Sequence, residues 1–301
     1  RSIAVTGVQT CALPILRRFL FEEHGVRGEW VRLQRSWQEA KQYQTLVSAE
    51  VESQLGQVMA ATVLLSATIK FKGAMIMQVQ GQGEVKALVA QATNERKVRC
   101  LARSEATVSQ QGLQGMMGSG SRLVLTIESD KGEPYQGIVG VAEDDLAAVL
   151  RTYFSQSEQL ETRLWLFANA TEAAGLFIQE LPGEKHERDD WERIELLAST
   201  TTAEEMFSLD CEELLHRLFH EEKVRVYEPE AVEFQCSCSR QKIGGTLLAL
   251  GKTELEAILQ ERDTIEVDCQ FCRAQYHFDK IDVENLLVNA VTDQNDSPTR
   301  H

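Results

Sequence analysis

The sequence predicts an α+β protein: a mostly antiparallel N-terminal sheet with helices, then a helical linker, then a small cysteine-containing domain. Three observations predict it. Strand-like runs joined by short turns fill most of the first 180 residues. Residues 183–222 are strongly acidic, with 13 acids and four bases. Four of the seven cysteines form two close pairs near the C-terminus.

Length and charge limit the classes of protein that this chain can belong to. At roughly 100–200 residues per domain, 301 residues suggest two domains. The 46 acids against 31 bases give a formal net charge of −15, which disfavours DNA, RNA and anionic membranes as partners. No apolar run reaches the roughly 18 residues that a membrane span needs.

The first 15 residues do not resemble the rest of the chain. They start without Met, contain Cys11 and Pro14, and show no amphipathic period. The basic start and long apolar core of a secretory signal are missing. We therefore expect residues 1–15 to be a head foreign to the fold, and we leave Cys11 out of the chemistry.

Residues 16–182 are expected to form the core domain. After a short strand at residues 30–33, apolar side chains recur every three or four positions over residues 48–70, as in a long amphipathic helix that Gly73 ends. Asp144 or Asp145 is expected to cap a further helix that ends near Tyr153. Alternating apolar and polar residues predict the remaining strands, at residues 75–80, 84–93, 97–102, 123–127, 135–141, 162–168 and 175–181.

Residues 183–233 are expected to form an acidic helical linker. Asp189 lies three residues before Glu192, and Asp210 lies three before Glu213, so both pairs can form capping boxes. Such short helices are marginally stable unless they dock, and we expect the core sheet and the cysteine domain to support them. A short strand is expected at residues 224–227. The linker helices carry two apolar stripes, formed by Trp191, Ile194 and Leu197 and by Leu214, Leu215, Leu218 and Phe219.

The cysteine pairs at Cys236 and Cys238 and at Cys269 and Cys272 predict a zinc site in residues 234–290. Four thiolates bind Zn²⁺ tetrahedrally. The apolar core of so small a domain cannot stabilise the fold by itself, so a metal cross-link is expected. A helix capped by Thr253 is expected between the pairs, and residues 291–301 are expected to be a frayed tail.

The first pair also suits a redox switch. A Cys-x-Cys disulfide is a small strained ring that is easily reduced again, and Arg240 and Lys242 nearby favour thiolate. A purely structural zinc site remains an alternative. His277, five residues after Cys272, is a less favoured alternative ligand.

Other candidate sites are weaker. The glycine-rich residues 115–120 lead into a strand, so we expect a turn and not a phosphate site. His216 and His220 are expected on a solvated helix face. Cys100 is expected in the core, whereas Cys211 at a helix N-terminus is a candidate for reactivity. No nucleophile–base–acid set appears, so we do not expect an enzyme.

Four longer motifs stand out along the chain: FLFEEHGVRGEWV at residues 19–31, LLSATIKFKG at 64–73, EPYQGIVG at 133–140 and SEQLETRLWL at 157–166. Together with the cysteine pairs, they resemble the heat shock protein 33 family of redox-regulated chaperones. The acidic helices and FQCSCSR…VDCQFC complete the match, which runs from about residue 16 to residue 287.

The resemblance implies an ATP-independent holdase of the bacterial cytoplasm that captures unfolding client proteins and dimerises when oxidised. It implies one Zn²⁺ per reduced chain on the four cysteines, and Cys236–Cys238 and Cys269–Cys272 disulfides after oxidation. The apolar linker stripes are then candidates for client binding. Rival functions are a structural zinc protein, a thiol–disulfide enzyme, and a zinc-dependent nucleic-acid-binding protein, although residues 234–287 hold only six bases against nine acids.

Overall fold

A computed structural model describes residues 15–69, 71–129, 132–182 and 188–295. The chain divides into two compact units, with the break between Gln235 and Cys236. Ile15 is the first residue of a strand, so our assignment of this residue to the foreign head is wrong. Residues 1–14, including Cys11, lie outside the described residues.

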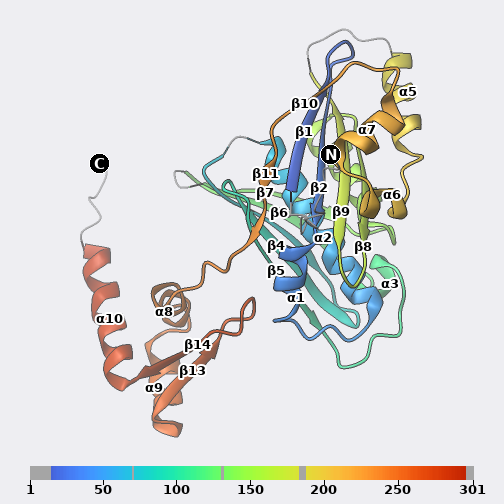
Figure 1. The fold of residues 1–301 in the computed structure, drawn as a ribbon. Coiled ribbons are helices and arrows are strands. Elements are labelled where there is room, and N and C mark those ends of the chain that lie inside the picture. Colours follow the sequence, from blue (N-terminus) through green and yellow to red (C-terminus); the bar gives the residue numbers. More distant parts are fainter. Residues whose placement is uncertain (1–14, 70, 130–131, 183–187, 296–301) are drawn as a thin grey trace, which may run out of the picture. The chain divides into compact units, whose positions relative to one another are not determined.

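The first unit contains two sheets (Figure 1). Sheet A has the strand order β10-β1-β2-β9-β8, and β11 also pairs with β1. Every pairing in sheet A is antiparallel. Its strands are β1 (Ile15–Phe21), β2 (Val26–Leu33), β8 (Thr162–Ala168), β9 (Ala173–Glu180), β10 (Val224–Val226) and β11 (Glu230–Ala231).

Sheet B has the strand order β12-β5-β4-β3-β6-β7. Only the short β12–β5 pairing is parallel, so the prediction of an α+β fold with mostly antiparallel sheets is confirmed. Its strands are β3 (Gly73–Gln80), β4 (Val85–Thr93), β5 (Lys97–Ser104), β6 (Arg122–Ser129), β7 (Tyr135–Gly140) and β12 (Glu233–Phe234).

Helix α2 (Ala49–Thr68) packs against strands of both sheets and forms the centre of the main core. The Ser48 side chain accepts a hydrogen bond from the Val51 N–H and caps the helix. The helix ends at Thr68, so our placement of its end at Gly73 is wrong. Gly73 opens β3 instead, at φ +141°, where a Cβ would lie 2.0 Å from the Glu128 carbonyl oxygen.

Several short helices lie in the connections between the longer elements of the first unit. Asp145 caps its helix by accepting a hydrogen bond from the Ala147 N–H, as one of the two predicted caps. A short helix stands where we expected only a turn at residues 115–120. These elements are α1 (Arg35–Lys41), α3 (Leu113–Met117), α4 (Leu146–Tyr153) and the π-helical turn η1 (Phe154–Glu158).

The acidic segment, residues 188–234, belongs to the first unit and folds onto its sheet A. Alternate residues of sheet A face opposite sides, so Leu16 and Val31 join the α2 core whereas Phe19 and Trp30 join a second apolar cluster. The helices of the acidic segment lie beside sheet A (Figure 1), and the second cluster contains apolar side chains of both. The helices are α5 (Arg188–Ala198), α6 (Ala203–Ser208) and α7 (Cys211–Phe219).

Capping boxes start two of these helices. The predicted box of Asp210 and Glu213 is confirmed at α7. A second, unpredicted box joins Thr202 and Glu205 at α6. The box predicted at Asp189 is wrong, because α5 already includes Arg188 and Asp189 therefore lies within its first turn.

Ion pairs also hold the acidic segment to the rest of the first unit. Arg17 of β1 pairs with Glu212 of α7, and Arg163 of β8 pairs with Glu195 of α5. Glu230 of β11 accepts from Arg18 at 2.8 Å and from Arg96 at 2.9 Å. Three acidic side chains of the segment, Glu195, Glu212 and Glu230, are thus paired with arginines of the rest of the first unit.

The second unit is small. Two helices, not the single predicted one, lie between the cysteine pairs. Gly251 precedes the second helix, so Thr253 lies inside it and is not its cap. The last helix runs to Asn295, past the expected start of a frayed tail. The elements are α8 (Arg240–Leu248), α9 (Lys252–Glu261), β13 (Thr264–Asp268), β14 (Gln275–Asp279) and α10 (Lys280–Asn295).

Among the described residues, no helix combines the length and the apolar character that crossing a membrane requires.

Candidate metal centre

Two loops of the second unit bring the cysteine pairs together. Cys236 and Cys238 lie between β12 and α8, and the Ser239 side chain caps α8 by accepting a hydrogen bond from the Lys242 N–H. Cys269 and Cys272 lie in the turn between β13 and β14. That turn is tightened by the Cys269 N–H, which donates to the Ala274 carbonyl oxygen at 2.8 Å.

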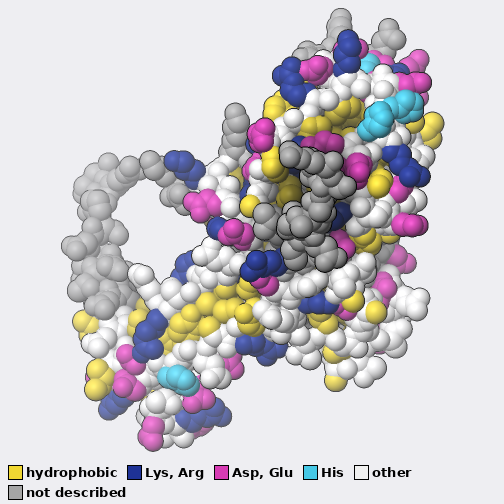
Figure 2. All heavy atoms as spheres, viewed as in Figure 1, with side chains coloured by type: hydrophobic (Ala, Val, Ile, Leu, Met, Phe, Trp, Pro, Cys, Tyr) yellow, Lys and Arg dark blue, Asp and Glu magenta, His cyan; other side chains and the backbone are white. Residues whose placement is uncertain are grey.

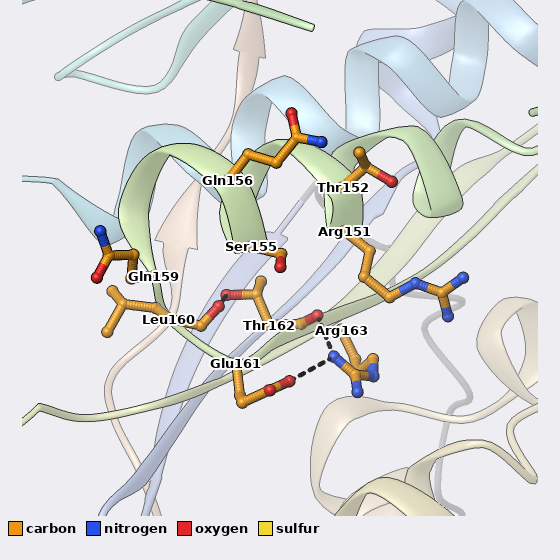
Figure 3. A pocket seen from close by; sticks show the side chains of 9 residues that line it. All are labelled: Arg151, Thr152, Ser155, Gln156, Gln159, Leu160, Glu161, Thr162 and Arg163. Carbon is orange, nitrogen blue, oxygen red and sulfur yellow. Dashed lines mark hydrogen bonds and ion pairs between the residues drawn. The ribbon is translucent and has the colours of Figure 1, made fainter. Parts of the chain in front are cut away.

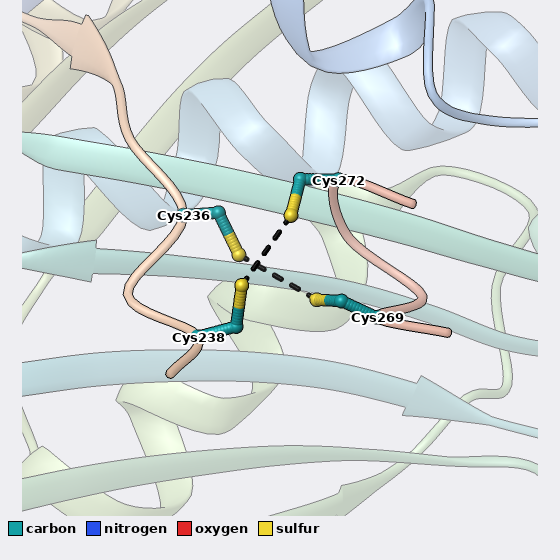
Figure 4. A group of neighbouring side chains, drawn as sticks. All are labelled: Cys236, Cys238, Cys269 and Cys272. Atoms are coloured by element: carbon teal, nitrogen blue, oxygen red, sulfur yellow. Dashed lines mark hydrogen bonds between the residues drawn. The ribbon is translucent and has the colours of Figure 1, made fainter. Parts of the chain in front are cut away.

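The four sulfur atoms converge on one point (Figure 4). Cys236 Sγ lies 3.6 Å from Cys269 Sγ, Cys238 Sγ lies 3.4 Å from Cys272 Sγ, and all four lie within 4.8 Å of one another. A tetrahedral ion with bonds of about 2.3 Å to sulfur requires sulfur–sulfur separations of about 3.8 Å. The donor set and its dimensions therefore fit a metal ion held by four thiolates.

Without a cation, this environment disfavours thiolates. Burial raises the pKa of the Cys269 thiol, although backbone N–H groups of Phe271 and Cys272 act in the opposite direction. Burial also raises the pKa of Cys272, and hydrogen bonds with the neighbouring thiols add to it. A bound cation reverses this effect, because it stabilises the deprotonated form of each sulfur.

Tyr276 makes a polar contact with the cluster that the sequence reading missed. Its hydroxyl donates to Cys238 Sγ at 3.1 Å, and this bond, more than burial, raises the pKa of Tyr276 to about 12. The signal was present in the strand pattern. Tyr276 and Phe278 alternate along β14, so both side chains face the apolar core of the unit.

Arg240 and His277 lie near the cluster, but their contacts differ from those expected from the sequence. The Arg240 guanidinium donates to the His277 carbonyl oxygen at 2.7 Å, pairs with Asp282 at 2.6 Å and lies over the Phe278 ring. The His277 side chain is 57% exposed and 3.6 Å from Glu266. The group of described residues that can hold a metal contains the four cysteines and does not include His277.

The other described cysteines are buried. Cys100 lies in the main core, as expected, and burial raises its pKa to about 12. Cys211 begins α7 but lies in the second apolar cluster, where burial raises its pKa. The candidate reactivity of Cys211 is therefore not supported. His216 and His220 lie on the exposed side of α7, as expected.

The candidate client-binding residues are mostly inaccessible in this form. Six of the seven have side chains that are at most 7% exposed, and the seventh, Leu197, packs against them while only partly buried. They and the sheet residues Phe19 and Trp30 share one apolar cluster. The six are Trp191, Ile194, Leu214, Leu215, Leu218 and Phe219.

The first unit also has a polar pocket of about 480 Å³, beside η1 and the start of β8 (Figure 3). Arg163 lies at its edge, where its guanidinium pairs with Glu161 and Glu195. The side chains around it are mostly hydroxyls and amides, which form no nucleophile–base pair.

On the face drawn in Figure 2, Lys and Arg side chains are scattered among Asp and Glu side chains and do not gather into one basic patch.

Comparisons with known proteins agree with the resemblance in the sequence. A family model described as "Hsp33 protein" matches residues 15–279. The chain is 54% identical over 276 residues to a "33 kDa chaperonin" of Nitrosococcus oceani, covering 92% of this chain and 95% of the relative. A protein of the same name from Shewanella loihica is 45% identical over 277 residues, with 92% and 96% covered.

A solved structure shares the fold. It is the crystal structure of the 33 kDa chaperonin (heat shock protein 33 homolog) of Thermotoga maritima, with a TM-score of 0.76 and 23% identity. The match covers 93% of this chain and 99% of that chain.

Proposed function

The chain belongs to the Hsp33 family, and from this membership we propose that it is a redox-regulated, ATP-independent holdase that binds unfolding proteins in the cytoplasm. The observation that carries the proposal is the four-sulfur cluster, which lies in a unit with little core of its own. The proposal includes a homodimer in the oxidised state. It includes no enzyme activity, nucleic acid or membrane.

We assign the metal as zinc, one ion per reduced chain, held by Cys236, Cys238, Cys269 and Cys272. Four thiolates in a tetrahedral arrangement are typical of structural zinc sites. The bound ion supplies a cross-link between the two loops and keeps the sulfurs deprotonated. The cysteines themselves carry the switch: their oxidation to Cys236–Cys238 and Cys269–Cys272 disulfides removes all four ligands and releases the metal.

Two sulfur–sulfur contacts bear on the disulfide assignment. Cys236 Sγ lies 3.6 Å from Cys269 Sγ and Cys238 Sγ lies 3.4 Å from Cys272 Sγ, and both contacts join the two loops. Disulfides within each loop therefore require the sulfurs to rearrange as they oxidise. Pairing within the loops leaves the loops unlinked to each other, which suits a switch that opens the unit.

The chain carries the change directly into the first unit. Cys236 is two residues after Phe234, whose strand β12 pairs with β5 and whose ring stacks on Tyr43 with centroids 5.4 Å apart. A rearrangement at Cys236 therefore pulls on the last strand of the acidic segment. Release of this segment from sheet A would uncover the apolar stripes that we assign to client binding.

The test compares reduced and oxidised protein. The reduced, zinc-bound chain should not prevent aggregation of a thermally unfolding client, whereas protein treated with peroxide at elevated temperature should prevent it without ATP. Reductant with zinc should reverse the change. Equal activity of both forms would leave a constitutive chaperone, and inactivity of both would leave a structural zinc protein.

Peptide mapping of the oxidised protein tests the disulfide assignment. We expect bridges within each pair, and a bridge between the pairs would contradict it. Zinc content measured before and after peroxide, with a chelating dye as acceptor, should fall from one ion per chain to none. Full zinc binding by the double variant Cys236→Ser/Cys238→Ser would refute the ligand assignment.

A further inference from the structure

One of the four sulfurs is contacted by a side-chain hydroxyl: Tyr276 Oη donates to Cys238 Sγ at 3.1 Å. We propose that this hydrogen bond protects Cys238 from oxidants, so that Tyr276 sets the rate at which the Cys236–Cys238 pair oxidises. The inference rests on the proposed function. It adds a residue that regulates how sensitive the switch is to peroxide.

The position of the hydroxyl is set by the core of the second unit. Tyr276 pairs with Val267 across the β13–β14 hairpin, and its ring packs against the cluster that contains Phe278. The ring is thus held from one side while the hydroxyl reaches the sulfur of the other loop. Replacing Tyr276 by Phe keeps this packing and removes only the donor.

The other loop has hydrogen bonds of a different kind. Cys269 Sγ accepts from the backbone N–H groups of Phe271 and Cys272, and Cys272 Sγ accepts from that of Ala274. Backbone donors belong to the turn itself and remain in any side-chain variant. The donor at Cys238 comes from a side chain, so a single substitution can remove it.

A hydrogen bond to sulfur slows the attack on peroxide because it stabilises the lone pair that must be donated. In that step Cys238 Sγ attacks one oxygen of hydrogen peroxide, an S–O bond forms, the O–O bond breaks, and hydroxide leaves and takes up a proton. Cys236 Sγ then attacks the sulfenic sulfur, an S–S bond forms and the S–O bond breaks, releasing a second hydroxide. Two thiolates, one peroxide and two protons become one disulfide and two waters.

The test uses the full-length reduced chain loaded with zinc, with one ion per chain verified first in wild type and variant. Peroxide is added, samples are alkylated at intervals, and the Cys236–Cys238 disulfide is quantified by peptide mapping. For Tyr276→Phe we expect this disulfide to form about three- to tenfold faster, the factor expected when a hydrogen bond to a charged acceptor is partly lost. Zinc transfer to a chelator without peroxide should change less than about twofold, because that process does not need the sulfur to act as a nucleophile.

Two further variants separate protection from general loosening. Phe278→Leu loosens the same core without touching the hydrogen bond, so it should speed zinc loss to chelator and to peroxide alike. Tyr227→Phe, at a tyrosine that is 42% exposed in the other unit, should change neither rate. In the cobalt-substituted protein, the sulfur-to-metal absorption band should shift for Tyr276→Phe and stay unchanged for Tyr227→Phe.

Several outcomes would overturn the inference. Equal peroxide rates in wild type and Tyr276→Phe would do so, as would equal acceleration of zinc loss to chelator and to peroxide. Should Tyr276→Phe fail to hold zinc, 3-fluorotyrosine at position 276 replaces it. This residue donates more strongly and must slow the oxidation; an unchanged rate refutes the inference. Failure of the wild-type chain to bind zinc at all would instead refute the proposed function.

Discussion

The two units of this chain obtain their stability in different ways. In the first, α2 is buried between two sheets, and side chains such as Trp37, Leu55 and Met59 are fully covered. In the described part of the second, the apolar core holds five buried residues, Leu247, Leu255, Ile265, Phe278 and Val283. A core that small cannot offset the conformational entropy of some sixty residues, so a cross-link must supply the difference.

The acidic segment lies between these two extremes. Its helices cover one face of sheet A through apolar side chains, yet many of its remaining contacts are ion pairs, such as those of Glu195, Glu212 and Glu230. Ion pairs near a surface contribute little individually and weaken in salt. A segment held in this way is suited to detach while the sheet beneath it stays folded.

The largest effect should follow loss of the proposed zinc ion from the second unit. Cys269→Ser, or a strong chelator, removes a contribution on the order of 10 kcal/mol. Hydrogen exchange should then show lost protection in β13, β14 and α8, while α2 and β3 keep theirs. A second unit that stays protected without metal would mean that its small core suffices, and the contrast between the units would fail.

The next effect concerns the docking of the acidic segment. Leu218→Ser/Phe219→Ser removes two side chains that are 6% and 2% exposed, each at a cost of about 2–5 kcal/mol. The reduced protein should then capture clients without oxidant while it still binds one zinc ion. Leu196→Ser, at a leucine of α5 that is 67% exposed, is the matched control and should leave the reduced protein inactive. A double variant with an unfolded segment, bound zinc and no client capture would show that the segment does not gate activity.

A smaller effect should appear with pH in the first unit. Burial raises the pKa of Glu29 to about 8, although Arg27, Arg18 and Arg96 act in the opposite direction. The unfolded chain releases the Glu29 proton near pH 4.5, whereas the folded chain keeps it up to a pH of about 8. Stability should therefore fall as pH rises through this window, by up to about 1.4 kcal/mol per pH unit, and Glu29→Gln should flatten the dependence. Denaturant unfolding at pH 5, 7 and 9 measures the free energy of unfolding of the wild type and of Glu29→Gln. If that free energy depends on pH equally in both proteins, Glu29 is not the group responsible.

The smallest effect should come from single ion pairs of the acidic segment. Arg163→Gln removes the partner of Glu195 and should weaken the docking of α5 by about 1 kcal/mol or less. Added salt should reduce the difference between variant and wild type. Lys86→Gln, which breaks an exposed pair with Glu105 on sheet B, should leave protection of α5 unchanged. If both variants loosen α5 equally, the effect is not local to the docked face.

Much of this organisation was predictable from the sequence because it is local. Apolar residues recur at every second position around Met75 and Leu123 and at every third or fourth position around Val58. These periods distinguish the two strands from the helix. The Asp210 capping box likewise needs only four residues. The spacing of the four cysteines predicted the sulfur cluster, because two close pairs in a small domain are typical of a metal site with four thiolate ligands.

Other features depended on tertiary structure, and the local signals were misleading there. Gly73 resembled a helix end but opens a strand, because close approach of Glu128 excludes a side chain. Cys211 resembled a reactive thiol, but its burial against sheet A raises its pKa. The linker prediction identified acidic amphipathic helices, but only the fold shows which face of sheet A receives them and which arginines neutralise them.

The sequence by itself determined most strands of the first unit, its long buried helix, the order of the regions, the family and the four converging cysteines, since each depends on neighbours in the chain or on motifs of fixed spacing. The tertiary structure alone decided which groups meet from distant positions: Arg96 with Glu230, 134 residues apart, and Tyr276 with Cys238, 38 residues apart. The physical reason is that burial and hydrogen-bond partners arise from packing between elements, and packing changes the chemistry of a side chain without leaving a local pattern in the sequence.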